Sequence, residues 1–232
     1  MRPDYGEAWA YESIIGALPG VDLTRAEAIA IQLLVFETAV LVLAWYYERW
    51  TAALAGTAAV AVAAVGSLEM LRISRAARAP ETPESYRKLL FSSSIEVVLA
   101  VLSFIALVTH LFVFDPRNGG LLVERLFGPD PPVLVVYLTL LVLWDLCYRI
   151  GTGWWASVVG LWRSVRYRFD PETAATLRRA DRETLLFGVA QLILVPFLLE
   201  HPVLLAALVG HVIAVTVVSG TSLVLLRVRE TG

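Results

Sequence analysis

The residues best suited to chemistry in this sequence are polar side chains that stand inside long apolar stretches. The candidates for an ion pathway or ion-binding site are Glu37, Glu69, Glu96, Asp145, Gln191, Ser219 and Thr221. An ionisable side chain is expensive inside a bilayer, so it is retained where it has a partner or a use, and proton relays and ion pathways are such uses. Carboxylate and hydroxyl oxygens are also the ligands that hard cations prefer. These residue types therefore indicate binding or transfer of a small cation or a proton.

Most of these side chains lie at a similar depth when each stretch is treated as an upright helix. The residues roughly four to seven positions, or about 6–11 Å, from the arginine-rich ends are Gln32, Glu96, Asp145, Gln191, Ser219 and Thr221. Glu69 is nearer to the end of its stretch, and Glu37 is nearer to the middle. A polar layer of this kind can line a water-filled vestibule.

A purely structural interpretation remains open for several of these groups. Asp145 and Arg149 are four residues apart on one helix, which is the spacing of a structural ion pair. Hydroxyl groups in apolar helices often bond to backbone carbonyls or allow close helix packing. Glu37 and Glu96 have no basic residue at helical spacing, so they fit this interpretation least well.

The three histidines suggest a second, different kind of site. His110, His201 and His211, together with Glu200, can supply imidazole and carboxylate ligands to a transition metal or relay protons. Their spacing matches no metal-binding motif, and His201 precedes a proline where it can simply cap a helix. We therefore expect no cofactor, and a metal-dependent redox protein or enzyme is an alternative to transport.

The composition assigns the chain to the membrane proteins. Of its 232 residues, 58% are hydrophobic and 17% are charged, against about 45–50% and about 25% in soluble domains. A folded chain of this length cannot hide such an apolar excess from water. The formal net charge is −2, so no basic field indicates nucleic-acid binding. The 19 basic residues include only one lysine, Lys88, which is typical of an archaeal or high-GC bacterial genome.

We predict an all-α integral membrane protein with six transmembrane helices in one bundle. The stretches that reach the required length of about 20 residues are 28–47, 50–71, 89–112, 131–150, 184–199 and 202–226. Thr24 with Glu27 has the spacing of a capping box. Thr82, Asp130, Asp170 and His201 each precede a proline at an expected helix start, and Pro196 is expected to kink or thin the fifth span. Segment 151–169 is expected to extend the fourth helix along the interface. The alternative is a seventh span, with a turn at Gly151 and Gly153.

The positions of the arginines predict the orientation. Connections 72–88 and 151–183 are rich in arginine, whereas the opposite connections are nearly neutral or acidic. This pattern indicates cytoplasmic N and C termini in the plasma membrane. The domains expected are an amphipathic, interfacial N-terminal segment 1–27, a single transmembrane domain 28–227 and a short cytoplasmic tail 228–232, in contact with the lipid bilayer.

Three functions follow from these observations. We favour a homo-oligomeric ion channel or carrier for a cation or proton. The alternatives are the membrane-embedded metal protein or enzyme and a non-catalytic scaffold or assembly subunit that binds a partner or anionic lipid through Arg178, Arg179 and Arg182. The spans contain no lysine for a retinal Schiff base, and no HExxH, GxSxG or Walker motif is present, so enzymatic activity is not favoured.

Overall fold

The computed structural model describes residue 9 and residues 24–79, 81–119 and 122–228. Of the expected amphipathic segment 1–27, only Trp9 and residues 24–27 are among the described residues. Most of the expected tail also lies outside them. The described chain is almost entirely helical, which confirms the all-α class.

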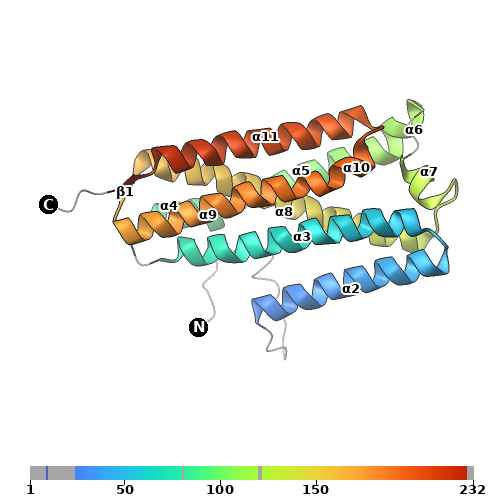
Figure 1. Cartoon of the computed structure of the whole chain (residues 1–232), viewed down its shortest axis with the longest axis horizontal. Helices are drawn as coiled ribbons and strands as arrows, with labels where there is room; N and C mark the ends of the chain where they lie inside the picture. The colour runs from blue at the N-terminus through green and yellow to red at the C-terminus, as the bar shows by residue number, and fades with distance from the viewer. Residues whose placement is uncertain (1–8, 10–23, 80, 120–121, 229–232) are drawn as a thin grey trace.

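Within the described residues, seven longer helices form a bundle that runs along one axis (Figure 1). They are α2 (Arg25–Tyr46), α3 (Trp50–Ala77), α4 (Glu84–Phe91), α5 (Ile95–Thr109), α8 (Val133–Arg166), α9 (Pro171–Ala190) and α11 (Pro202–Leu225). Two of them, α4 and α5, follow one another. Short elements extend or join them: η1 (His110–Phe114, a π-helix), α6 (Asp115–Arg117), α7 (Leu122–Phe127), η2 (Gln191–Leu194, a 3-10 helix) and α10 (Val195–Leu198). Strands β1 (Arg168–Phe169) and β2 (Arg227–Val228) pair in parallel.

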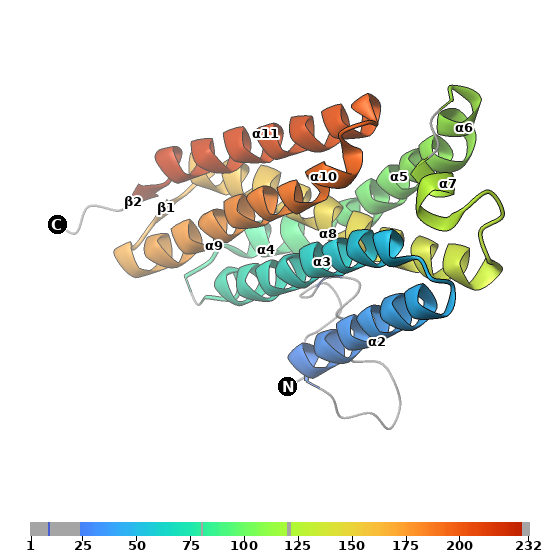
Figure 2. The ribbon, with the colours of Figure 1, turned by 45° about the vertical axis from the view of Figure 1, so that its right-hand side comes forward.

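The bundle has two distinct ends, which we call the strand end, where β1 and β2 pair, and the α7 end, where α6 and α7 lie (Figure 1). The chain passes between these ends in alternating directions. Helix α8 packs against α3, α5, α9 and α11, so it is the central helix. Helix α2 lies at the edge of the bundle, beside α3 (Figure 2).

Within the described residues, five helical segments are long and apolar enough to cross a membrane. They are Ala26–Tyr46, Trp50–Ala77, Glu84–Arg117, Val133–Arg166 and Pro202–Leu225. The structure divides the expected span 184–199 among α9, η2 and α10. Pro196 explains this division, because it has no N–H to donate to the carbonyl of Leu192 and its ring disturbs the preceding turn.

Helix α8 includes most of segment 151–169, for which the sequence left a helical extension and a separate span as alternatives. It is a continuous helix of 34 residues, so Gly151 and Gly153 lie within it and do not form a turn. The segment extends the fourth helix as far as Arg166, which confirms the predicted helical extension, and its course along the interface stays a prediction. A separate seventh span that begins at Gly151 would require a break that α8 does not have.

Local signals placed several helix ends correctly. Thr24 and Glu27 form the predicted capping box, and Asp170 caps α9 by accepting hydrogen bonds from backbone N–H groups. The predicted caps at Thr82 and Asp130 are wrong, because α4 and α8 begin one or two residues later and their N-cap residues are prolines. Proline at the N-cap offers no side-chain acceptor, so neither of these helices has a side-chain cap.

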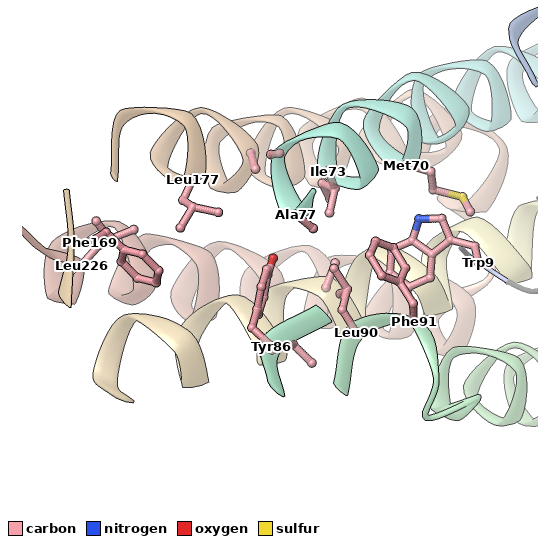
Figure 3. Packing of buried hydrophobic residues seen from close by; sticks show 14 of the residues in the cluster. Trp9, Met70, Ile73, Ala77, Tyr86, Leu90, Phe91, Phe169, Leu177 and Leu226 are labelled. Carbon is pink, nitrogen blue, oxygen red and sulfur yellow. The ribbon is translucent and has the colours of Figure 1, made fainter. Parts of the chain in front are cut away.

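The largest buried apolar cluster fills the strand-end half of the bundle (Figure 3). Tyr86 and Leu90 are four residues apart on α4, so they share the face that packs inward. The members labelled in the figure are Trp9, Met70, Ile73, Ala77, Tyr86, Leu90, Phe91, Phe169, Leu177 and Leu226. The cluster joins α3, α4, α8, α9 and the strand pair, so this half has a packed interior.

Candidate functional site

Buried polar side chains follow the central helix through much of its length. On α8 they run from Asp145 to Arg163, a separation of 18 residues, or about 27 Å of helix. The charged groups among them contact different neighbouring helices, α2 at Asp145 and α4 and α9 at Arg163. The candidate site is therefore a series of polar contacts along α8, and it does not form the single polar layer expected from the sequence.

The first contact joins α8 to α2. Arg149 donates from Nε to Asp145 Oδ2 at 2.9 Å and from Nη2 to Asp145 Oδ1 at 2.8 Å. Gln32 Nε2 also donates to Asp145 Oδ1, at 2.8 Å. Both charged side chains are buried, at 3% and 1% exposure. Asp145 is thus neutralised by a bidentate partner on its own helix, which suits a structural role better than ion release.

The second contact brings the two helices that carry the buried acids Glu69 and Glu96 against one turn of α8. Glu69 of α3 approaches Gly153, where a Cβ atom would lie 3.2 Å from Glu69 Oε2. Helix α5 approaches Gly151, where a Cβ atom would lie 3.1 Å from the backbone nitrogen of Ala100 and 3.4 Å from the carbonyl oxygen of Glu96. The segment Gly151–Thr152–Gly153 therefore lets both acid-bearing helices come close to α8.

These two acids have fewer hydrogen-bond partners than buried carboxyl groups normally have. Neither carboxyl oxygen of Glu69 has a hydrogen-bond partner among the residues that the structure describes. Oε2 of Glu96 has none among them either. Thr184 is near Glu69, but its hydroxyl donates to the carbonyl of Ala180 at 3.4 Å. Both carboxyl groups are almost fully buried, at 2% and 1% exposure. An unpaired buried carboxyl group is a costly feature that calls for an explanation.

An interruption of the helix between α4 and α5 accounts for the position of Glu96. Helix α4 ends at Phe91, and Ser94 has φ 54°, a left-handed conformation that separates α4 from α5. Glu96 then lies in the first turn of α5, where the unpaired N–H groups of a helix favour negative charge. The run of three serines thus has a structural role in placing this acid.

The remaining candidates from the sequence are dispersed. Glu37 accepts a hydrogen bond from Thr57 Oγ1 at 2.7 Å. Gln191 and Ser219 are buried, and Gln191 Oε1 and Ser219 Oγ have no partner within the described part of the chain. Thr221 is exposed and donates to a carbonyl of its own helix, so it lies away from the interior.

Sequence reasoning missed a third contact, a buried network at the strand end. Arg163 donates from Nη2 to Asp181 Oδ1 at 2.7 Å and from Nη1 to Tyr86 Oη at 2.9 Å. Ser222 donates to Asp181 Oδ2 at 2.9 Å, and its oxygen lies 2.9 Å from that of Ser164. Asp181 is buried, and the positive charge of Arg163 stabilises its carboxylate. The network joins α4, α8, α9 and α11 through one buried ion pair.

Two of the three histidines approach one carboxylate at the α7 end. His201 Nδ1 lies 3.5 Å from Asp115 Oδ1, and His110 Nε2 lies 4.0 Å from the same oxygen. Asp115 was not among the residues singled out from the sequence. Asp115 Oδ2 also accepts from the backbone N–H of Leu122 at 3.3 Å, so this carboxylate ties η1 and α6 to α7.

The other two members of the proposed metal set lie elsewhere. Glu200 forms an ion pair with Arg125, and the ring centroid of His211 is 6.1 Å from that of Trp154. In the described ranges, no three histidine, cysteine or acidic side chains are grouped so that they could hold a metal ion. The expected four-residue set of His110, Glu200, His201 and His211 is therefore not brought together.

Comparison with known proteins adds a family and no function. No curated protein and no solved structure matches this chain. One protein family, described as a family of unknown function (DUF7530), matches residues 4–222 and so includes every polar contact described above. This match covers most of the sequence, and the chain therefore belongs to the DUF7530 family.

Proposed function

We propose that this protein is a membrane channel or carrier that moves protons past buried carboxyl groups beside α8. The observation that carries the proposal is the pair Glu69 and Glu96, whose helices approach Gly151–Gly153 and which have no cationic partner among the described residues. A carboxyl group in a low-dielectric interior is held most cheaply with a proton bound, and it must release that proton to become charged. Proton binding and release give these acids a use that packing does not.

The arrangement favours a proton over a metal cation. A hard cation such as Ca²⁺ takes six to eight oxygen ligands, and Mg²⁺ takes six. Glu69 and Glu96 approach α8 from different helices, and Asp145 is occupied by Arg149 and Gln32. One carboxyl group with a few hydroxyl neighbours is sufficient to bind a proton. Glu37, with Thr57 beside it, provides a further proton-binding group on α2.

The proposal includes a membrane topology. The chain makes six passes along the bundle if α9, η2 and α10 count as one of them, and the N-terminal end of α2 and the C-terminal end of α11 both point toward the strand end (Figure 1). Exposed basic side chains at that end include Arg72, Arg166, Arg179 and Arg182. We therefore assign the strand end to the cytoplasm and the protein to the plasma membrane, as a homo-oligomer.

Proton flux into proteoliposomes tests this function. A potassium gradient with valinomycin sets the membrane potential, and a trapped pH-sensitive dye reports the initial rate of proton entry. We expect flux in the wild type and its reduction to the level of empty liposomes in the Glu69→Gln and Glu96→Gln variants, since an amide cannot exchange a proton in this way. The single variant Glu37→Gln tests whether α2 contributes.

The matched control is Glu200→Gln, since Glu200 is exposed at the α7 end and pairs only with Arg125 among described residues. Its flux should equal that of the wild type. Equal flux in the wild type, Glu69→Gln and Glu96→Gln would contradict the proposed path. Flux of potassium or sodium without flux of protons would show that the transported species is a metal cation and would contradict proton transport.

The strand end supports one alternative, a scaffold that binds anionic lipid or a partner through arginines. Arg179 and Arg182 are exposed there, whereas Arg178 donates to the carbonyl of Leu226 and is structural. Under this alternative, Arg179→Gln/Arg182→Gln abolishes binding to anionic vesicles and the purified protein shows no proton flux. Absence of flux together with that loss of binding would favour the scaffold.

A further inference from the structure

A cavity of about 540 Å³ opens at the α7 end, apart from the polar contacts along α8. Its walls come from α2, α3, α7, α8, α10 and α11 and from the end of α5. The α3 side is lined by small residues, including Ala52, Ala55 and Gly56, and the α8 side by larger ones, including Leu138 and Leu146. The small residues on α3 create the space, because nothing from that helix extends into it.

The lining excludes water as the main occupant. Nearly all lining side chains are aliphatic or aromatic. The hydroxyl of Thr139, one of the few polar groups in the wall, donates to the carbonyl of Val135 at 2.7 Å. A buried water molecule needs about two to four polar partners, which this interior does not offer. The volume is within the range of roughly 300–1,000 Å³ typical of ligand sites, so an apolar molecule fits it.

The rim of the cavity carries a charged group held in a defined place. Arg49, in the connection between α2 and α3, lines the cavity and is exposed. Its guanidinium lies against Gly128, where a Cβ atom would be only 2.6 Å from Nη2. Gly128 also has φ 87°, which favours glycine, so this residue both turns the chain and leaves room for Arg49. Among the described residues, Arg49 has no ion-pair or hydrogen-bond partner for its side chain.

We infer that this cavity binds a membrane phospholipid, with a hydrocarbon chain inside it and the phosphate group on Arg49. A planar guanidinium binds phosphate oxygens through two parallel hydrogen bonds. Asp130, which lines the same cavity and is exposed, can accept from an ammonium or hydroxyl group of the head. The walls are helices long and apolar enough to lie in a bilayer, so phospholipid is the amphiphile in contact with the opening. This site is independent of the proposed proton path.

Photolabelling with a phospholipid that carries a diazirine in one chain tests the site. The protein is purified in detergent, incubated with the probe in mixed micelles, irradiated, digested and analysed by mass spectrometry. We expect labels on lining residues of α3 and α8. Ala55→Phe fills the cavity and should abolish these labels, whereas Arg49→Gln leaves the cavity intact and should weaken probe binding about tenfold, the scale of a lost charge-assisted hydrogen bond.

Ala61→Phe is the matched control, because Ala61 is on the same helix and is exposed outside the cavity. It should label as the wild type does. Arg49 is exposed, so we expect the Arg49→Gln variant to fold. It therefore tests the site even if the Ala55→Phe variant fails to fold. Three results would each overturn the inference. The first is labels outside the cavity, and the second is equal labelling of the wild type and Ala55→Phe. The third is equal competition by phospholipid and by an uncharged diacylglycerol, together with no effect of Arg49→Gln.

Discussion

At the strand end, the helices enclose one continuous buried cluster and a paired arginine, whereas at the α7 end they enclose a cavity. Leu90 and Leu177 are fully buried in the strand-end cluster, and Arg163 is buried with three partners nearby. Leu138, on the part of α8 nearer the α7 end, is only half-buried and lines the cavity. The same central helix therefore supports a close-packed interior at one end and an open one at the other.

This difference indicates where stability and function lie. A close-packed interior with a satisfied ion pair resists change, because removal of any part leaves a gap or an unpaired charge. An apolar cavity with a charged rim can exchange its contents. Glu69 and Glu96 lie against α8 between Arg149 and Ser157, between these two regions. The following predictions test the contrast, beginning with the largest expected effect.

Removal of one partner of the buried ion pair at the strand end should reduce the free energy of unfolding more than any other change predicted below. Asp181→Ala leaves Arg163 charged and buried, so we expect the free energy of unfolding to fall by about 3–5 kcal/mol. Arg163→Met should reduce this free energy by less, because the buried carboxyl group of Asp181 can take up a proton and become neutral, whereas arginine keeps its charge. Unfolding in mixed micelles with increasing SDS measures both values.

The double variant Arg163→Met/Asp181→Leu is the control for this pair. It removes both charges at once and should be more stable than Asp181→Ala, because no unpaired ion remains in the interior. If Asp181→Ala and the double variant lose the same stability, then the packing of these side chains matters, and the charge does not.

A Leu→Ala pair compares the two interiors directly. Leu90→Ala, in the strand-end cluster, should reduce the free energy of unfolding by about 2–5 kcal/mol, as buried leucines do. Leu138→Ala should reduce it by less in delipidated protein, because Leu138 already faces empty space and has fewer contacts to lose. SDS unfolding of both variants under the same conditions gives the comparison.

Addition of phospholipid sharpens this result. With the cavity occupied, Leu138 gains contacts, so the cost of Leu138→Ala should rise while that of Leu90→Ala stays constant. Equal costs for the two variants without lipid would show that the α7 end is as closely packed as the strand end.

Sequence patterns placed the local features of this fold and missed those that depend on contacts between helices. The capping box at Thr24, the cap at Asp170 and the disruption at Pro196 each depend on a few neighbouring residues, so the sequence is sufficient to predict them. Arg163 was assigned to an arginine-rich connection because its partner, Asp181, is on the next long helix, α9. Arg163 has no acidic residue three or four positions away that would indicate an ion pair, and Asp181 has the exposed-looking arginines of the same segment beside it in the sequence.

The candidate site was predicted in its parts and not in its arrangement. Glu69 and Glu96 were recognised because charge is unexpected in apolar stretches. Their approach to the same turn of α8 depends on Gly151 and Gly153, which suggested a turn when the sequence was considered alone. A glycine within a helix has this second meaning, close helix packing, which becomes evident only when the neighbouring helix is placed.

Gly151→Ala tests that close approach at the boundary between the two regions. A Cβ atom there would lie 3.1 Å from a backbone nitrogen of α5, which cannot move as a flexible side chain can. Overpacking costs about 1–3 kcal/mol, and the better helix propensity of alanine returns about 1 kcal/mol, so we expect a net loss of about 1 kcal/mol. Gly210→Ala on α11 is the matched control.

A Cβ atom at Gly210 would meet no atom within 4 Å, so that variant should gain stability or remain unchanged. SDS unfolding of both variants measures the difference. If Gly151→Ala is as stable as Gly210→Ala, then α5 and α8 are not in close contact at this turn.

The smallest effect concerns the cap of α9 at the strand end and depends on pH. The side chain and backbone N–H of Thr173, together with the N–H of Glu172, donate to the Asp170 carboxylate and lower its pKa. Because the folded-state pKa is below the unfolded value of about 3.9, the carboxylate stabilises the fold above that value. This contribution is lost as the pH falls through the folded-state pKa.

Asp170→Asn separates the charge from the cap, because an amide oxygen still accepts from the N–H groups and does not titrate. We expect the wild type to melt at a higher temperature than Asp170→Asn near neutral pH, and this gap to close below about pH 3.9. The melting temperatures of both proteins, measured in the same detergent across this range, give the gap. A gap that stays constant or widens on acidification would mean that the hydrogen-bond geometry of the cap, and not its negative charge, holds this end of α9 in place.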